Sequence, residues 1–271
     1  MRFDSLQNKK QHPVGCPLDA VDTLIASPRH TDADLNHWKY WLAYDYLHIN
    51  SPQYATHIRL TRQTIDAFVG RKRDYYVSVS WGKDSVVLAH MMWLAGSRCK
   101  YVYVRNLARE PEGNIAVRDA FLSRYPDLDY EEISYDYADA DETYYDSKGN
   151  PHKWQSILLS LREQYGCHVT GIRHDESAKR RRRFAYFGQE TEYSYAPFRY
   201  LTVRDVFAYL LENKLPIHPN YAMTGGGRWD KYRIRVAAIG NTEGDGMGRL
   251  QWEQEYYSDI LAKVRGPIST I

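Results

Sequence analysis

The sequence has little cysteine and no long apolar segment. Its three cysteines, Cys16, Cys99 and Cys167, are widely spaced, and no two of them form a Cys-x-x-Cys pair. The chain therefore has neither a zinc knuckle nor a dithiol redox motif of that type. Its longest largely apolar stretch, residues 88–96, is too short to span a bilayer. Because its first residues also lack the apolar stretch of a signal peptide, we expect a reduced, cytoplasmic protein with no membrane partner.

The chain also lacks a strong charge of either sign. Its formal net charge is +2 over 271 residues, so no global field draws it to nucleic acid. The charge is nevertheless uneven. Residues 127–146 contain many Asp and Glu but no Lys or Arg, whereas residues 179–183 read Lys-Arg-Arg-Arg-Arg. Local fields should therefore matter more than the total charge.

Apolar periodicity predicts a helical start followed by alternating strands and helices. Ser51 and Pro52 are typical of a helix start, as N-cap and first helical residue. From residue 75, strand-like runs alternate with helical stripes, which predicts a parallel sheet with helices on both faces. The expected strands are 75–80, 100–104, 130–135, 168–172 and 193–196, and the expected helices lie near 38–46, 51–69, 85–95, 114–124, 154–165, 203–211 and 250–264. The fold class is therefore α/β, a three-layer α/β/α domain with an N-terminal helical extension.

Residues 80–85, Ser-Trp-Gly-Lys-Asp-Ser, connect the first expected strand to the next helix. Free N–H groups at a helix start point toward ligands above the strand ends, and the helix dipole favours an anion there. Gly82 permits close approach of the backbone to phosphate, and Lys83 adds a positive charge. Ser80 and Ser85 add hydroxyl groups. The segment lacks the glycine spacing and the Lys-Ser pair of a Walker loop, so we predict a different kind of di- or triphosphate site.

The same six residues resemble the pyrophosphate loop of the adenine nucleotide α-hydrolase-like superfamily, usually Ser-Gly-Gly-x-Asp-Ser. The Lys before Asp is similar to the phosphoadenosine phosphosulfate (PAPS) reductase family, the small subunit of ATP sulfurylase and DNA phosphorothioation enzymes. Residues 171–177, Gly-Ile-Arg-His-Asp-Glu-Ser, resemble the segment in which these families deliver an arginine toward the phosphates. Residues 196–221 resemble their Pro, Thr-x-x-Asp-Val and Leu-Pro…Pro-x-Tyr pattern. Trp81 stands where glycine or phenylalanine is commoner, a change that fits if its side chain points away from phosphate.

The resemblance ends at the reactive cysteine. PAPS reductases act through a cysteine in a C-terminal Glu-Cys-Gly-type motif, and some relatives carry cysteine pairs for an iron–sulfur cluster. No cysteine follows Cys167 here. We therefore expect no iron–sulfur cluster, and a protein that is not a true PAPS reductase. The resemblance instead implies ATP and Mg²⁺, with pyrophosphate leaving while an acceptor oxygen becomes an adenylate.

The motifs also assign site residues. The resemblance implies catalytic roles for Lys83, Asp84 and Arg173, with Lys83 and Arg173 neutralising charge as the α–β bond breaks. Asp84 is the candidate metal ligand, and Asn106 follows the second expected strand, where ligands often bind a parallel sheet. The assigned nucleotide-binding residues are Ser80, Trp81, Gly82, Lys83, Asp84, Ser85, Asn106, Gly171 and Arg173. The residues assigned to a polyanionic substrate are Lys179, Arg180, Arg181, Arg182, Arg183 and Arg228, although the basic run equally fits a solvated helix face.

Three functions remain open. The first is activation of an acceptor for sulfur or nitrogen transfer, with nucleic acid as a candidate acceptor and a protein as a candidate sulfur donor. The second is ATP sulfurylase-like adenylylation of a small oxyanion, and the third is a non-catalytic sensor of ATP or PAPS or a partner-dependent subunit. An oligomer is compatible with each of these functions.

The sequence also predicts the domain organisation. We expect an arm and helical extension in residues 1–70, the nucleotide-binding domain in 71–221, and a Gly/Arg/aromatic loop with a C-terminal helix in 222–271.

Overall fold

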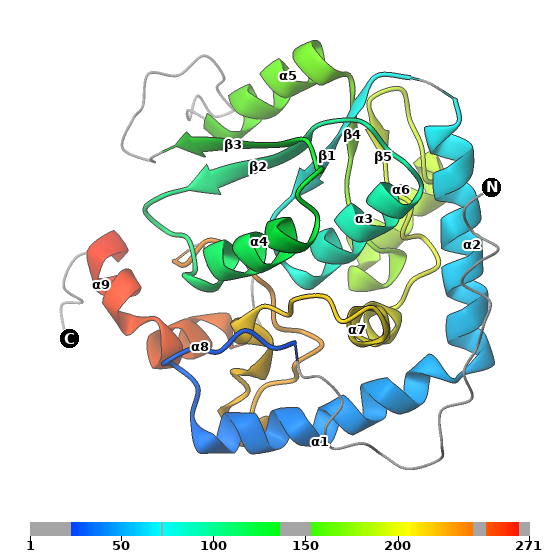
Figure 1. Ribbon diagram of the computed structural model, residues 1–271. Helices are drawn as coiled ribbons and strands as arrows, with labels where there is room; N and C mark the ends of the chain where they lie inside the picture. Colours follow the sequence, from blue (N-terminus) through cyan, green and yellow to red (C-terminus); the bar gives the residue numbers. More distant parts are fainter. Residues whose placement is uncertain (1–22, 72, 136–152, 241–247, 266–271) are drawn as a thin grey trace.

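The computed structural model describes residues 23–71, 73–135, 153–240 and 248–265 (Figure 1). Most of the predicted N-terminal arm, the acidic loop expected after residue 135 and part of the glycine-rich tail lie outside these residues. Within the described part, no helix is long and apolar enough to cross a membrane.

A five-stranded parallel sheet forms the centre of the described structure. Its strands are β1 (Tyr75–Val79), β2 (Tyr101–Asn106), β3 (Tyr130–Tyr135), β4 (Cys167–Val169) and β5 (Ser194–Tyr195), in the order β3-β2-β1-β4-β5. All four neighbouring pairs are parallel. The prediction of a parallel α/β sheet is confirmed.

Helices cover both faces of the sheet, as Figure 1 shows, with α5 on one side and α3 and α4 on the other. The helices are α1 (Asp32–Ile49), α2 (Pro52–Val69), α3 (Lys83–Leu94), α4 (Gly113–Arg124), α5 (Lys153–Tyr165), α6 (Ala178–Phe187), α7 (Val203–Glu212), α8 (Arg249–Tyr256) and α9 (Ser258–Arg265). Short 3₁₀ helices are η2 (His174–Glu176), η3 (Pro219–Ala222) and η4 (Gly225–Gly227).

Side chains alternate between the two faces of β1, as the strand period requires. Val77 and Val79 are buried in the larger core, together with apolar residues of α3, α4 and α7. Tyr76 points to the opposite face, where it joins a smaller cluster with Leu161 of α5. Apolar clusters therefore pack against both faces of the sheet.

The two N-terminal helices are attached to the domain through α7. The carboxylate of Asp205 is fully buried, and it lies 2.8 Å from His48 Nε2 of α1 and 2.8 Å from His57 Nδ1 of α2. Burial by itself would raise the pKa of Asp205, but hydrogen bonds from Thr202 and the two histidines lower it below its usual value. One carboxylate thus fixes both helices against the same element.

Several predicted boundaries are wrong. The strand expected over 168–172 ends at Val169, because β5 pairs only with His168 and Val169. The single helix expected over 250–264 is interrupted at Tyr257, where φ is −136°. The basic run, for which no helix was assigned, lies in α6. The helix after the first strand begins at Lys83, two residues earlier than expected.

Candidate nucleotide-binding site

Trp81 lies in the turn between β1 and α3 and has φ of 58°, in the left-handed region that favours glycine. Its indole is fully buried and packs against the rings of Tyr103, Phe121 and Tyr130, with centroid distances of 6.4, 5.7 and 5.7 Å. Aromatic packing of this kind stabilises a backbone conformation that tryptophan rarely adopts. The side chain is therefore part of the core beneath the turn.

The first turn of α3 presents backbone N–H groups at the end of β1. The N–H of Lys83 donates to the hydroxyl of Tyr221 at 3.0 Å. In the described part of the chain, no protein group accepts from the N–H of Asp84 or Ser85. Such N–H groups at a helix start, together with the helix dipole, can hold an anion.

The serines of the turn support its shape. The Ser85 hydroxyl accepts from the backbone N–H of Ser80 at 3.1 Å and donates to the carbonyl oxygen of Gly82 at 3.0 Å. Ser85 therefore bridges both sides of the turn. Its hydroxyl is engaged with the protein, so its role here is to hold the loop.

The Lys83 side chain is buried beside this turn. Its ammonium lies 3.0 Å from Asp84 Oδ2 and 5.1 Å from the ring centroid of Tyr221. Burial lowers the pKa of Lys83 below its usual value of 10.5. An added anion would therefore stabilise the charged form of this lysine.

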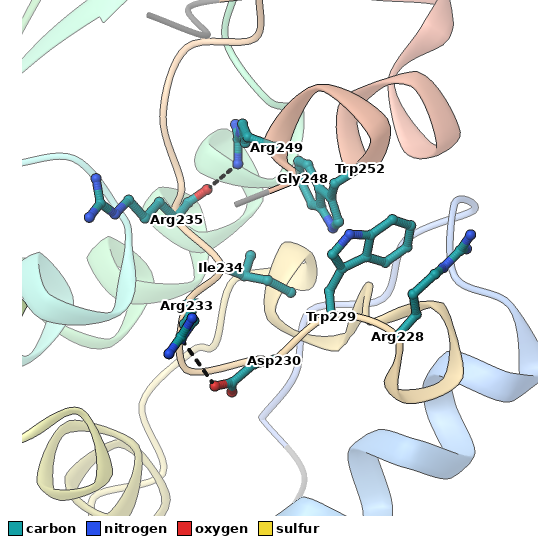
Figure 2. A pocket seen from close by; sticks show the side chains of 9 residues that line it. All are labelled: Arg228, Trp229, Asp230, Arg233, Ile234, Arg235, Gly248, Arg249 and Trp252. Atoms are coloured by element: carbon teal, nitrogen blue, oxygen red, sulfur yellow. Dashed lines mark hydrogen bonds and ion pairs between the residues drawn. The ribbon is translucent and has the colours of Figure 1, made fainter. Parts of the chain in front are cut away.

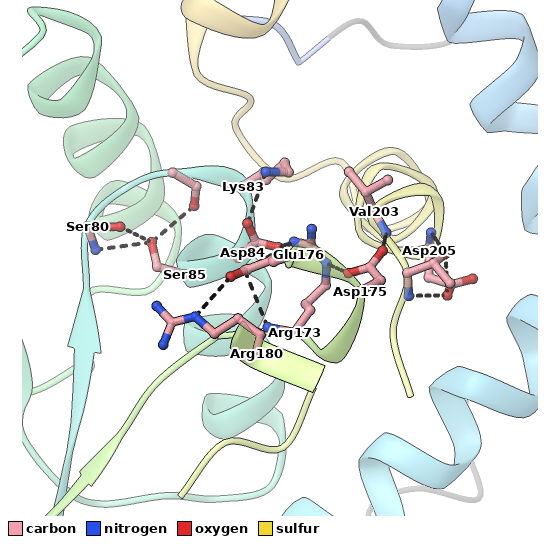
Figure 3. Close-up of polar contacts among 12 residues, drawn as sticks. Ser80, Lys83, Asp84, Ser85, Arg173, Asp175, Glu176, Arg180, Val203 and Asp205 are labelled. Atoms are coloured by element: carbon pink, nitrogen blue, oxygen red, sulfur yellow. Dashed lines mark hydrogen bonds and ion pairs between the residues drawn. The ribbon is translucent and has the colours of Figure 1, made fainter. Parts of the chain in front are cut away.

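Arg173 follows β4 and reaches the same place (Figure 3). Its buried guanidinium contacts the carboxylate of Asp84 through Nη1 and that of Asp175 through Nε, the latter at 2.8 Å. Its Nη1 also lies 3.9 Å from Glu176 Oε1. The second oxygen of Asp175 accepts from the N–H of Val203 at 2.9 Å. Arg173 therefore joins the starts of α3, η2 and α7.

Gly171 permits this approach. A Cβ atom added to Gly171 would lie 3.0 Å from the carbonyl oxygen of Asp84, tighter than ordinary van der Waals contact. The segment after β4 therefore needs glycine to pass the first turn of α3. Gly171, which we predicted from the sequence to bind nucleotide, is therefore required here because it has no side chain.

Charges in this cluster are balanced. Its cations are Lys83, Arg173 and Arg180, and its carboxylates are Asp84, Asp175 and Glu176, with Arg180 Nε 3.5 Å from Glu176 Oε2. An incoming phosphate would therefore compete with the carboxylates for these cations. The N–H groups of the first turn of α3 would be its additional partners.

Asn106 ends β2 at the same edge of the sheet. Its Nδ2 donates to the hydroxyl of Tyr135 at 3.3 Å, and its Oδ1 is buried without a partner in the residues described. The neighbouring carboxylate of Glu110 contacts Tyr103 and Arg105. Across the described ranges, no contact joins Asn106 to the Lys83–Arg173 cluster.

The five basic residues 179–183 have different environments in α6. Arg180 reaches Glu176 of the cluster, and Arg183 donates to the Ser194 hydroxyl at 2.9 Å. Lys179, Arg181 and Arg182 are exposed. The structure thus brings one of the five into contact with the cluster.

Arg228 lines a separate pocket of about 250 Å³ (Figure 2). Its guanidinium pairs with Glu255 of α8 and lies 4.0 Å from the ring centroid of Trp229. The full lining is Arg228, Trp229, Asp230, Arg233, Ile234, Arg235, Gly248, Arg249 and Trp252. Arg228 therefore belongs to this pocket, and no contact with Lys83 or Arg173 is found among the described residues.

The segment around this pocket runs beside the turn after β1. Lys231 is fully buried, pairs with Asp45 of α1, and lies 4.4 Å from the ring centroid of Phe207. Further along, a Cβ atom added to Gly82 would lie 3.5 Å from Cβ of Val236. The ion pair therefore anchors a segment that passes the first turn of α3.

A metal site is not evident in the described ranges, where no group of three or more His, Cys, Asp or Glu side chains could hold an ion. The carboxylate oxygens of Asp84 contact Arg173 and Lys83. Asp84 would have to exchange one of these partners to ligate a metal ion. Its role as a metal ligand stays a prediction.

Three residues at the site were missed as site residues in the sequence: Tyr221, Asp175 and Glu176. Tyr221 ends the Leu-Pro…Pro-x-Tyr segment, and the two carboxylates closely follow Arg173. Their positions in the sequence, within or next to motifs already assigned to the site, could have identified them as site residues. Their contacts with the turn and the guanidinium depend on tertiary packing, which the sequence pattern does not contain.

Comparison with known families finds one match. The phosphoadenosine phosphosulfate reductase domain matches residues 74–225, which include β1 to β5, the turn after β1, Arg173 and Tyr221. The N-terminal helices α1 and α2 and the segment lining the pocket lie outside the match. A comparison with curated proteins gives no match.

Solved structures show similarity at low identity. The U34-tRNA thiolase NcsA from Methanococcus maripaludis, described with its [4Fe-4S] cluster, is 15% identical over 76% of this chain and 80% of that chain, with a TM-score of 0.41. A phosphoadenylyl-sulfate reductase from Candida auris, in a phosphate complex, is 15% identical over 61% of this chain and 85% of that chain, with a TM-score of 0.41. These similarities concern the fold.

The thiolase contradicts the expectation, made above for this chain, that no iron–sulfur cluster is present. It is described with a [4Fe-4S] cluster, whereas the expectation relied on the number and spacing of cysteines in one chain. That spacing does not determine which groups occur among proteins of similar fold. The expectation is therefore withdrawn.

Proposed function

Because the chain belongs to the phosphoadenosine phosphosulfate reductase domain family, we propose that it is an enzyme that binds ATP and cleaves the α–β phosphate bond. An acceptor oxygen attacks the α-phosphorus, the bond to the β-phosphate breaks, and pyrophosphate leaves. The acceptor becomes an adenylate, from which a sulfur or nitrogen nucleophile displaces AMP. The proposal thus places activation of an acceptor before the group transfer.

One observation supports the proposal most strongly. The N–H groups of Asp84 and Ser85, which have no acceptor among the described residues, lie at the start of α3 beside the buried ammonium of Lys83 and the guanidinium of Arg173. These groups come from the carboxyl ends of neighbouring parallel strands, where ligands of α/β sheets bind. N–H groups with two cations suit a polyphosphate better than they suit a neutral ligand.

Each residue has a stated part in the proposal. The N–H groups hold phosphate oxygens, and Lys83 and Arg173 stabilise the charge that develops on the leaving pyrophosphate. Asp84 keeps both cations oriented before the nucleotide enters. Magnesium enters with the nucleotide as its counterion, and we assign no step to a protein-bound metal because both oxygens of Asp84 are already paired.

The described cysteines favour this chemistry over thiol-based reduction. Burial raises the pKa of Cys99 to about 11, and burial also raises the pKa of Cys167. A thiol with a raised pKa is a poor nucleophile because the thiolate is the reactive form. We therefore propose an activity other than PAPS reduction.

The test is incubation of the purified protein with α-labelled ATP and Mg²⁺, with RNA, with DNA, with sulfate or with no acceptor. The expected products are AMP or an adenylate together with pyrophosphate. Lys83→Met is the matched variant, and Lys39→Met on α1 is the control because both changes remove one lysine charge. Production of ADP would contradict cleavage at the α–β bond.

The acceptor arms separate the remaining alternatives. Stimulation by sulfate alone would identify an adenylyltransferase acting on a small oxyanion. ATP binding without any product in every arm would favour a nucleotide sensor or a partner-dependent subunit. Stimulation by one polymer would identify the acceptor class.

A further inference from the structure

Helix α6 presents an exposed face that is both basic and aromatic. We define this basic face as Lys179, Arg181, Arg182, Tyr186 and Phe187. Tyr186 and Phe187 are 82% and 63% exposed, and the three cations are also exposed. Phe184 is the buried residue of this helix, so most of its surface contacts solvent.

The cations of the basic face are free of protein partners in the ranges described. Arg180 and Arg183, which lie between and beside them, pair with Glu176 and Ser194. No such contact is found for Lys179, Arg181 or Arg182. Clustered cations repel one another, so an external anion bound here would relieve that repulsion.

Tyr186 and Phe187 expose their aromatic rings on the same helix as the cations. Lys179, Arg182 and Tyr186 are spaced three and four residues apart, which places them along one side of α6. Phe187 extends the apolar surface at the end of the helix. An exposed ring beside exposed guanidinium groups offers stacking for a flat base and charge for a phosphate.

Arg180, between Lys179 and Arg181 of the basic face, connects α6 with the candidate nucleotide site. Glu176 lies 3.9 Å from Arg173 and 3.5 Å from Arg180, so one carboxylate links the site to the first turn of α6. Figure 3 shows the contact of Arg180 with Glu176 beside the contacts that Arg173 makes with Asp84 and Asp175. A polymer bound along α6 would therefore extend toward the place where the α-phosphate is proposed to react.

We propose that the basic face of α6 binds single-stranded nucleic acid, or an unpaired loop, and that this polymer is the acceptor. The inference rests on the proposed function for the acceptor role, whereas the binding itself does not. Lys179, Arg181 and Arg182 contact the phosphates, and Tyr186 and Phe187 stack on unpaired bases. Duplexes bind more weakly because their bases are stacked within the helix.

The experiment measures binding of full-length protein to fluorescein-labelled single-stranded RNA, the same sequence as DNA, and the corresponding duplexes, over a range of salt concentrations. Arg181→Ala with Arg182→Ala should reduce the magnitude of the salt slope by about 1.4, since each single-strand contact contributes about 0.7. Tyr186→Ala should weaken binding by about tenfold and leave the slope unchanged. Arg59→Ala with Arg98→Ala is the control, because both residues are exposed and lie outside α6.

Preference for single strands, lost in the α6 variants and kept in the control, would support the inference. Equal binding of single strands and duplexes, a flat salt dependence, or equal loss in the control would overturn it. Binding of polyglutamate or of anionic phosphatidylserine vesicles as tight as that of single strands would also overturn it, because these ligands carry negative charge but no bases. Thermal unfolding of each variant checks that it remains folded.

Lys83→Met separates this inference from the proposed function. That variant should bind single strands normally while losing turnover of ATP. Binding without α-phosphate products in the wild-type protein would retain the nucleic-acid site and contradict the proposed reaction. Turnover without nucleic-acid binding would retain the reaction and contradict the site.

Discussion

The hydroxyl of Tyr221 accepts a hydrogen bond from the backbone N–H of Lys83 at 3.0 Å. These residues are 138 positions apart, yet they meet at the first turn of α3. The ring of Tyr221 also lies 5.1 Å from the Lys83 ammonium. One side chain thus contacts both the backbone and the side chain of the central residue in the candidate site.

Tyr221→Phe should remove the hydrogen bond and keep the ring. The free energy of unfolding should fall by about 1 kcal/mol, the typical net value of such a bond. Urea unfolding of the wild type, Tyr221→Phe and the exposed control Tyr44→Phe measures this difference. An unchanged midpoint for Tyr221→Phe would show that the freed N–H finds an equally good partner.

Lys83→Met should reduce ATP turnover by about 10²-fold, since a charge acting on the leaving group contributes at this level. Burial lowers the pKa of Lys83, so wild-type kcat/KM should fall on the alkaline side below pH 10.5. Between the lowered pKa and 10.5, the unfolded chain binds the additional proton, so stability rises with pH in that window. Lys83→Met should remove this contribution, which urea unfolding at several alkaline pH values would detect.

Asp84→Asn distinguishes two roles for the carboxylate. If Asp84 holds Lys83 and Arg173 and competes with phosphate, the variant should bind inorganic pyrophosphate several-fold more tightly without metal. If Asp84 ligates magnesium, the variant should instead bind MgATP more weakly and show little change with metal-free pyrophosphate. Isothermal titration calorimetry of both ligands separates these outcomes.

At Trp81, replacement by glycine should lower the free energy of unfolding less than replacement by alanine. Trp81→Ala removes a buried indole and should cost about 3–5 kcal/mol, while the backbone stays in the left-handed region. Trp81→Gly creates a similar cavity but relieves about 1 kcal/mol of backbone strain. The glycine variant should therefore be the more stable of the two in urea unfolding, and the opposite order would contradict the strain.

The energetic role of the buried ion pair between Lys231 and Asp45 can be tested by comparing a single variant with a double variant. Lys231→Met leaves a buried carboxylate without its cation and should cost about 3–5 kcal/mol. Lys231→Met combined with Asp45→Leu should recover most of that loss, because neither charge remains buried. Equal loss in the single and double variants would mean that packing of the lysine stem dominates.

Strong local signals predicted much of the fold. Ser51 accepts from the N–H of Tyr54 and Pro52 begins α2, as the helix-start pattern indicates. The alternating strands and helices predicted the sheet because each apolar run is long enough to show its period. Helix α6 was missed because its large apolar residues, Phe184, Tyr186 and Phe187, stand together at its end after the basic run, so no apolar residue recurs along one face.

The candidate site was predicted in part. The turn after β1 and the arginine after β4 were found from local motifs, and the structure brings Asp84 and Arg173 into contact. The pairing of cations with Asp175 and Glu176 could not be predicted, because the sequence does not state which charges meet. Arg228 was predicted to bind a polyanionic substrate together with residues 179–183. In the structure it pairs with Glu255 and lines the pocket near α8, away from the Lys83–Arg173 cluster.

The order of the strands has a consequence for folding. The chain leaves β1 toward β2 and β3 and then returns across the sheet to β4, so Asp84 and Arg173 meet across 89 residues. Such a contact closes a long loop and forms late, after local helices and turns. Both halves of the sheet must assemble before the two residues can contact a common ligand. A bound nucleotide would therefore protect the sheet against global unfolding more than it would protect any one loop.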